Sequence, residues 1–452
     1  MRGRRGGNRP SAAVAVVAGF VVLAVVLAIG WWSVQERSVS LDLDDLRESA
    51  QAAAADGMDG SGAVGSAQAA GSAGLLAQVQ QALADGDRAA LDELAAGSPR
   101  SLTVLRRWAD NVEALGLEDL SLRYVAATVA ARDAATAEAS DRWDAEVEVS
   151  YRDPFAGEGR VRTTAAVSFA DIDSGDATQV AVVGAGGAGG RTPLWMSSDL
   201  VVETEGRVTA RVAAGSSLDV GRVARLGEKA VRQVRRTLPA WDGPLVLEVP
   251  SGTDGVAHVL GEPEGAYDAV AAVTTTIDGS GDDASPVHVV VNPVVLGTLG
   301  NRGEQVVITH EAVHVATGAS TAPELPLWLM EGFADWASLR VADLPDDVAA
   351  GALLEQVRED GPPGRLPGVL EFDPGGDQFG ISYEAAWLAV RLIAEEYGPR
   401  AATAFYRQVD DGAAVEQAFD ALGTTEADFT VAWQRYLQRL AGVPEVAGAT
   451  TS

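Results

Sequence analysis

Residues 301–318 of the sequence read NRGEQVVITHEAVHVATG and contain the pattern His-Glu-x-x-His. Residues four apart in an α-helix lie on the same face, so His310 and His314 can bind one metal ion through their neutral imidazole nitrogens. Asn301 begins an Asn-x-x-Glu pattern that predicts the start of this helix, and Gly318 predicts its end. The stretch therefore predicts a buried helix that carries a metal site.

The glutamate that directly follows the first histidine of this pattern predicts hydrolytic chemistry. Glu311 follows His310 directly, so it can point past the metal toward an open coordination position and act as general base for a water there. The chain has only 4 histidines, which makes chance a poor explanation for the pattern. The alternative is a histidine pair that is part of the core or the surface and binds no metal.

A third ligand is needed, because a catalytic zinc usually has three protein ligands and one open position. Pro326 favours the start of a second helix, and Glu331 on that helix follows His314 after a chain segment long enough for a turn. Asp335 lies one helical turn after Glu331, where it could accept a hydrogen bond from a ligand imidazole. The alternative for both acids is an exposed acidic helix face.

These residues resemble the gluzincin metallopeptidases, in which His-Glu-x-x-His is followed by a glutamate on a second helix. The run Glu-Gly-Phe-Ala-Asp-Trp at 331–336 is similar to the peptidase-MA-like group, and the resemblance extends roughly over residues 245–440. It implies Zn²⁺ as cofactor, a zincin-like fold with a mostly helical carboxyl-terminal part, and a peptide or protein as substrate.

The same resemblance implies a tyrosine that stabilises the oxyanion. The segment around Tyr383 is similar to the tyrosine-bearing segment of the group, so Tyr383 is a candidate catalytic residue beside Glu311. The alternative is a partly buried helix aromatic. The sequence contains no Gly-x-Met-x-Asn segment of the large gluzincin aminopeptidases, which leaves endopeptidase activity as the default. We expect structural or surface roles for His258 and His288.

The amino terminus predicts a membrane segment. An uncharged run from Ala12 to Trp32 follows several arginines, and a helix of this length would span about 31 Å, close to the thickness of a bilayer core. The positive-inside rule then predicts a cytoplasmic basic tail (1–10), a single transmembrane anchor (11–33) and an extracytoplasmic location for the rest. A cleaved signal peptide is the alternative.

Two folded units are expected after the anchor, in an α+β fold class. Residues 34–74 are rich in Ala, Gly and Ser and predict a flexible tether. Residues 75–216 have helices followed by strands and resemble small NTF2-like domains of exported bacterial proteins; a spacer without chemistry is the expected role. Residues 217–442 form the zinc metallopeptidase domain, in which 287–291 could be an edge strand that binds an extended peptide. A disordered tail (443–452) follows.

Composition excludes some functions. The net charge is −30 and the chain has no cysteine, which argues against nucleic-acid binding and excludes a thiolate zinc site or thiol nucleophile. The basic residues cluster only at Arg232, Arg235 and Arg236 beyond the amino terminus. The sequence thus favours a membrane-anchored, extracytoplasmic zinc peptidase of undetermined oligomeric state. The alternatives are a zinc-containing binding or scaffold protein of the cell envelope with little turnover, and a domain without metal.

Overall fold

The structure is a computed structural model in which residues 61–128, 142–173, 178–187, 190–282, 284–322, 325–340, 342, 344–373, 376 and 378–444 are described. The predicted basic tail 1–10 and transmembrane anchor 11–33 lie outside these residues, as do residues 34–60 of the predicted tether and all but the start of the predicted carboxyl-terminal tail.

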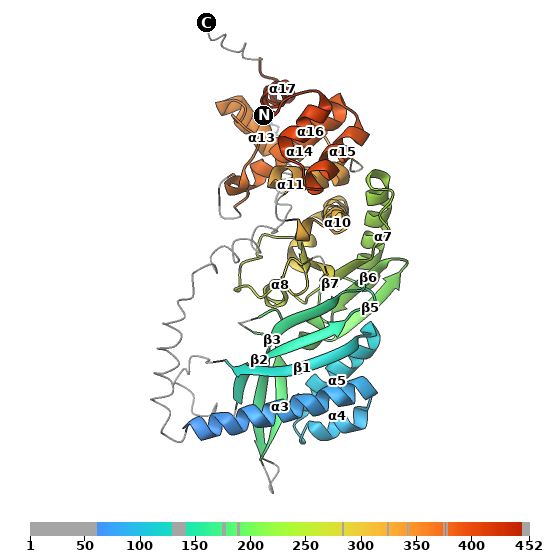
Figure 1. Ribbon diagram of the computed structural model, residues 1–452, viewed down its shortest axis with the longest axis vertical. Helices are drawn as coiled ribbons and strands as arrows, with labels where there is room; N and C mark the ends of the chain where they lie inside the picture. Colours follow the sequence, from blue (N-terminus) through green and yellow to red (C-terminus); the bar gives the residue numbers. More distant parts are fainter. Residues whose placement is uncertain are drawn as a thin grey trace, which may run out of the picture.

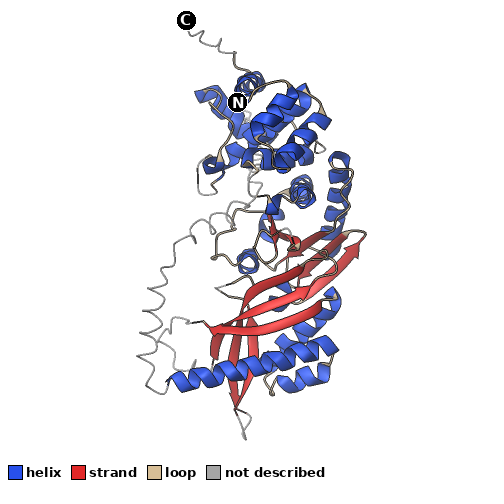
Figure 2. Cartoon of the chain, viewed as in Figure 1, coloured by secondary structure: helices blue, strands red, loops and turns tan. Residues whose placement is uncertain are grey.

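Within the described ranges, no helix is both long enough and apolar enough to cross a membrane. The predicted fold class, α+β with a transmembrane helix, is therefore wrong in its transmembrane part for the residues that the structure describes. Its α+β part agrees with the structure, which contains two separate sheets and many helices (Figure 2).

The first sheet is an antiparallel meander of four strands in the order β1-β2-β3-β4. Helices α3 and α5 pack against it, and α4 packs against these two helices, at the lower end of Figure 1. The bounds of these elements are β1 Glu118–Ala127, β2 Arg142–Arg152, β3 Arg160–Asp173, β4 Thr178–Ala185, α3 Ser61–Asp85, α4 Arg88–Leu94 and α5 Pro99–Leu115. Their shared core is made of alternating inward-facing residues of the strands and the apolar faces of the helices, as half-buried strands require.

Helix α3 begins earlier than the sequence predicted. The flexible tether was expected to extend to Gly74, but residues 61–74 are helical and continuous with the rest of α3. Alanine is the best helix former, and Leu76 and Val79, in the following part of this helix, are fully buried. The small residue Gly71 lets the helix approach the sheet, because a Cβ there would lie 2.8 Å from Val180. The Ala/Gly composition here permits close packing, so the tether prediction is wrong over this range.

The second sheet has five strands in the order β5-β6-β7-β9-β8. Its strands are β5 Leu200–Glu205, β6 Val208–Ala213, β7 Leu245–Val249, β8 Ala272–Thr276 and β9 Val287–Val291. Strands β5 and β6 lie within residues 75–216, the range expected for the first unit, yet β6 pairs in parallel with β7. Strand β9, predicted as an edge strand, lies between β7 and β8. The edge strands are β5 and β8, and β8 was not predicted from the sequence.

The two sheets are joined by a buried group of charged side chains, which we call the interdomain ion cluster: Asp153, Arg211, Glu248 and His288. The Arg211 guanidinium contacts Asp153 at 2.6 Å and Glu248 at 3.1 Å. His288 Nδ1 lies 3.1 Å from the same Glu248 oxygen. Asp153 follows β2 of the first sheet, whereas the other three residues belong to β6, β7 and β9 of the second. The cluster therefore ties one sheet to the other.

Helices form the rest of the molecule and surround the site described below (Figure 1). Their bounds are α6 Leu194–Ser197, α7 Val220–Thr237, α8 Thr253–Leu260, α9 Pro293–Leu296, α10 Gly300–Thr317, α11 Leu327–Leu339, α12 Asp346–Ala349, α13 Gly351–Asp360, α14 Phe379–Glu396, α15 Pro399–Asp410, α16 Val415–Leu422 and α17 Glu426–Ala441. Helices α11 and α14 cross very closely at Gly332, where a Cβ would lie 2.3 Å from the carbonyl oxygen of Ala386. Only glycine fits there, which explains the glycine that follows Glu331.

Candidate metal centre

Helix α10 carries the His-Glu-x-x-His pattern and ends as predicted, with Gly318 in the left-handed conformation. Its start differs from the prediction, because Asn301 does not cap the helix. The Asn301 and Glu304 side chains instead accept hydrogen bonds from Arg222 of α7, at 2.9 Å and 2.6 Å. These contacts fix the first turn of α10 to α7, so the helix is anchored at its amino-terminal end by a neighbouring helix.

Three ligand atoms converge where α10 meets α11. His310 Nε2 and His314 Nε2 lie 2.9 Å apart, and Glu331 Oε2 lies 3.2 Å from the first and 3.4 Å from the second. Ligands at 2.0–2.1 Å from a tetrahedral zinc are separated from one another by about 3.3 Å. The three residues therefore have the donor set and nearly the spacing of a zinc site with three protein ligands.

The electrostatics of these atoms also fit a cation. All three side chains are buried. Burial opposes the charged form of Glu331, but attraction and hydrogen bonding from His314 and His310 outweigh it and lower the pKa of Glu331 to about 2. Burial likewise opposes the charge on His310, yet Asp335 and Glu331 raise the pKa of His310 well above its usual range. The group thus attracts positive charge to its centre, which a divalent cation would supply.

Asp335 lies behind His310, as its position one turn after Glu331 predicted. Its Oδ1 is 2.8 Å from His310 Nδ1, and its side chain is largely buried. This contact leaves Nε2 of His310 free to face the metal position and holds the ring in one orientation. Glu331 and Asp335 are not an exposed acidic face.

Glu311 is buried beside the candidate ligands and is held by β8, a strand that was not predicted from the sequence. The hydroxyl of Thr274 in β8 donates to Glu311 Oε2 at 2.6 Å and is itself fully buried. The edge strand and the carboxylate expected to act as base are therefore directly connected. The threonines at 274–276 could have predicted a strand, since β-branched residues favour strands. No sequence pattern near them could have predicted the contact with Glu311.

Tyr383 is brought to the same region by α14. Its ring packs edge to face against Phe372 and Phe379, with centroids 5.1 Å and 5.2 Å away. Burial first, and then the nearby carboxylates of Glu331, Asp335 and Glu311, raise the pKa of Tyr383 well above its usual range. The phenol therefore keeps its proton near neutral pH and can donate a hydrogen bond.

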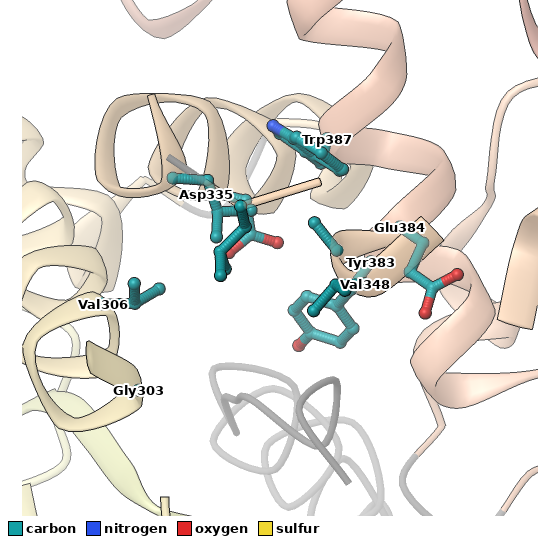
Figure 3. A pocket seen from close by; sticks show the side chains of 10 residues that line it. Gly303, Val306, Asp335, Val348, Tyr383, Glu384 and Trp387 are labelled. Atoms are coloured by element: carbon teal, nitrogen blue, oxygen red, sulfur yellow. The ribbon is translucent and has the colours of Figure 1, made fainter. Parts of the chain in front are cut away.

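A small cavity of about 40 Å³ lies between Asp335 and Tyr383 (Figure 3). Its walls come from α10, α11, α14 and residues 344–349, and it is large enough for a few water molecules. Glu384 lines its far side, where Oε2 accepts a hydrogen bond from the backbone of Leu353 at 2.6 Å. Burial raises the pKa of Glu384 to about 7. This carboxyl group positions α13 and is not one of the converging ligands.

The other histidines lie elsewhere. His258 is partly exposed in α8, 4.0 Å from Glu264. His288 belongs to the interdomain ion cluster. Among the described residues, only His310, His314 and Glu331 bring three candidate ligand atoms together.

Comparison with known proteins adds no relative: no family model matches the chain, and neither a curated protein nor a solved structure is detectably similar.

Proposed function

We propose that the protein is a zinc-dependent hydrolase of peptide bonds. The observation that carries this proposal is the convergence of His310 Nε2, His314 Nε2 and Glu331 Oε2 on one point, with the Glu311 carboxylate held beside them by Thr274. A site that only stored or bound zinc would not need a buried carboxylate in that place. When bound, Zn²⁺ supplies a Lewis acid that polarises a carbonyl group and lowers the pKa of water.

The residues of the chain have separate tasks in this proposal. Glu311 accepts a proton from the attacking water and passes it to the leaving amine, as a general base and then a general acid. Tyr383 donates its hydroxyl hydrogen to the developing oxyanion. Asp335 keeps His310 in the orientation and tautomer that the metal requires.

Strand β8 supports the choice of a peptide as substrate. It pairs with β9 along one side, and it is the last strand in the described sheet order. An extended peptide can bind to such an edge through main-chain hydrogen bonds. Because Thr274 of β8 contacts Glu311, a peptide aligned with this strand would run past the proposed base.

The test is cleavage-site mapping on a peptide library with the zinc-loaded full chain and its Glu311→Gln variant. We expect both to bind about one zinc per chain, and the variant to hydrolyse peptides about 10²–10⁴-fold more slowly. Full activity in the variant would exclude Glu311 as the base. A zinc-loaded wild type that cleaves nothing would favour the alternative, a zinc-containing binding or scaffold protein.

A further inference from the structure

A second concave surface lies on the outside of the helical region, where the carboxyl-terminal end of α7 faces α15 (Figure 1). It is a groove of about 1,310 Å³. Four arginines line it: Arg236 near the end of α7, Arg340 just after α11, and Arg400 and Arg407 on α15. We call it the arginine groove.

The charge of this groove is opposite to that of the molecule. The chain has 34 basic and 64 acidic residues, whereas the groove has four guanidinium groups and a single carboxylate, that of Asp411. The sequence showed only the neighbouring arginines 232, 235 and 236. In the structure Arg232 pairs with Glu228 and Arg235 donates to the carbonyl oxygen of Trp241, so only Arg236 of that group belongs to the groove.

Intramolecular stability does not explain the whole cluster. Arg236 and Arg340 lie at the carboxyl-terminal ends of their helices, where a cation is favourable. Arg400 is in the first turn of α15, directly after Pro399, where the positive end of the helix dipole disfavours it. Among the described residues, neither Arg236 nor Arg400 forms a salt bridge or side-chain hydrogen bond. Arg340 does have internal contacts, because it donates a hydrogen bond to the Thr237 hydroxyl at 3.2 Å and lies over the Trp336 ring. Two of the four like charges therefore lie here without such a partner, as they do in a site for an anion.

The walls between the arginines indicate the kind of anion. They contain Tyr397 and the prolines 239 and 399 together with alanines, so the groove offers both charged and apolar surface. Tyrosine and arginine are enriched among the residues that dominate protein–protein binding, and a guanidinium group binds a carboxylate through two parallel hydrogen bonds. The volume also exceeds the usual range for a small-molecule pocket, about 300–1,000 Å³.

We propose that the arginine groove binds an acidic peptide segment of a partner protein, one in which Asp or Glu side chains alternate with apolar ones. The groove and the metal centre share no residue, so this binding does not depend on the proposed hydrolase activity.

The test uses fluorescence anisotropy with the zinc-loaded full chain and a labelled peptide of about twelve residues, which is about 40 Å long when extended. The peptide alternates Asp and Glu with Leu and Tyr, and mass spectrometry checks that it stays intact. The groove variant combines Arg236→Gln, Arg400→Gln and Arg407→Gln. The control variant combines Arg225→Gln, Arg232→Gln and Arg435→Gln, three exposed arginines outside the groove, so both variants have the same net charge.

We expect the groove variant to bind the acidic peptide at least about tenfold more weakly than wild type, and the control variant to differ by less than about twofold. A peptide with Asn and Gln in place of the acids should bind weakly to all three proteins. The groove variant should melt within a few degrees of wild type, because its three substituted arginines are exposed and make only small contributions to stability. If both variants bound the acidic peptide equally weakly, the loss would be due to the change in net charge, and the proposal would be overturned. Wild type could instead bind polyphosphate or phosphatidylglycerol vesicles more tightly than the acidic peptide, and the groove variant could lose that binding. This result would show that the ligand of the groove is not an acidic peptide.

Discussion

The metal centre and the interdomain ion cluster are both buried groups of histidine and carboxylate side chains, and they differ in where the positive charge lies. In the interdomain ion cluster, Arg211 stands between Asp153 and Glu248 and contacts both, so the cation is part of the chain. In the metal centre, two imidazoles and one carboxylate direct single atoms to a shared point, and within the described residues no arginine or lysine pairs with Glu331.

The directions of the ligand atoms distinguish a structural ion network from a metal site. In the network, the two ring nitrogens of His288 face two different carboxylates, at 3.1 Å and 3.8 Å, so no single ion could bind all of them. In the metal centre, the Nε2 atoms of both histidines face each other. Convergence of the ligand atoms, and not the presence of histidine and acids, marks the candidate metal site.

The largest expected effect comes from removing the built-in cation of the interdomain ion cluster. Arg211→Met keeps an unbranched apolar side chain but removes the guanidinium that contacts both Asp153 and Glu248, which leaves the two acids buried without it. We expect the free energy of unfolding to fall by about 3–5 kcal/mol, measured by urea denaturation, while zinc binding at the separate metal centre persists.

Arg123→Met is the matched control, since Arg123 and its partner Glu148 form a more exposed pair on the first sheet. That substitution should cost less than about 1 kcal/mol. If the two substitutions had equal effects, the interdomain ion cluster would not be what stabilises the junction between the sheets.

A smaller effect is expected for Asp335→Asn, which tests whether this residue orients a metal ligand. Asparagine keeps the size and one acceptor but removes the charge that His310 Nδ1 faces. Zinc affinity should fall about 10- to 100-fold, measured by competition with a chromophoric chelator. Glu384→Gln changes a buried carboxyl group lining the same cavity and should leave the affinity almost unchanged; an equal loss there would assign the effect to packing.

The smallest effect is a pH dependence of the interdomain ion cluster. Burial alone would raise the pKa of Glu248, but His288 and Arg211 outweigh it and lower this pKa to about 2. A carboxyl group with a depressed folded-state pKa contributes stability above its unfolded-state pKa of about 4.3 and loses it as pH falls toward the folded-state value. The stability difference between wild type and Glu248→Gln should therefore be constant from neutral pH to about pH 5 and shrink below it. A difference that stays constant to pH 3 would contradict this assignment.

The sequence could predict which residues converge at the candidate metal centre, because these residues are close together in the chain. His310 and His314 share a helix face through their spacing, and Glu331 and Asp335 follow on the next helix after one turn. The interdomain ion cluster could not be predicted, because its members are separated by up to 135 residues between Asp153 and His288 and have no regular spacing. The contact between Thr274 and Glu311 could not be predicted for the same reason, since only the folded sheet brings the two residues together.

The Ala/Gly/Ser composition led to a wrong prediction in the first part of α3, where small residues pack against the first sheet. The Ala/Gly/Ser stretch before Leu75 favoured a tether, yet Gly71 allows α3 to lie against the first sheet. Strands β5 and β6 were included in the unit 75–216 because of their position in the chain, whereas β6 pairs in parallel with β7, more than thirty residues later. A local sequence pattern does not show which distant strand a given strand will pair with.

Zinc stoichiometry tests the central claim most directly. The full chain, its His314→Ala variant and its His288→Ala variant are stripped with a chelator, reconstituted with zinc, dialysed and measured by elemental analysis, with circular dichroism to show that each is folded. We predict about one zinc per chain for wild type and His288→Ala, and almost none for His314→Ala. A wild type without zinc, or full zinc in His314→Ala, would contradict the account.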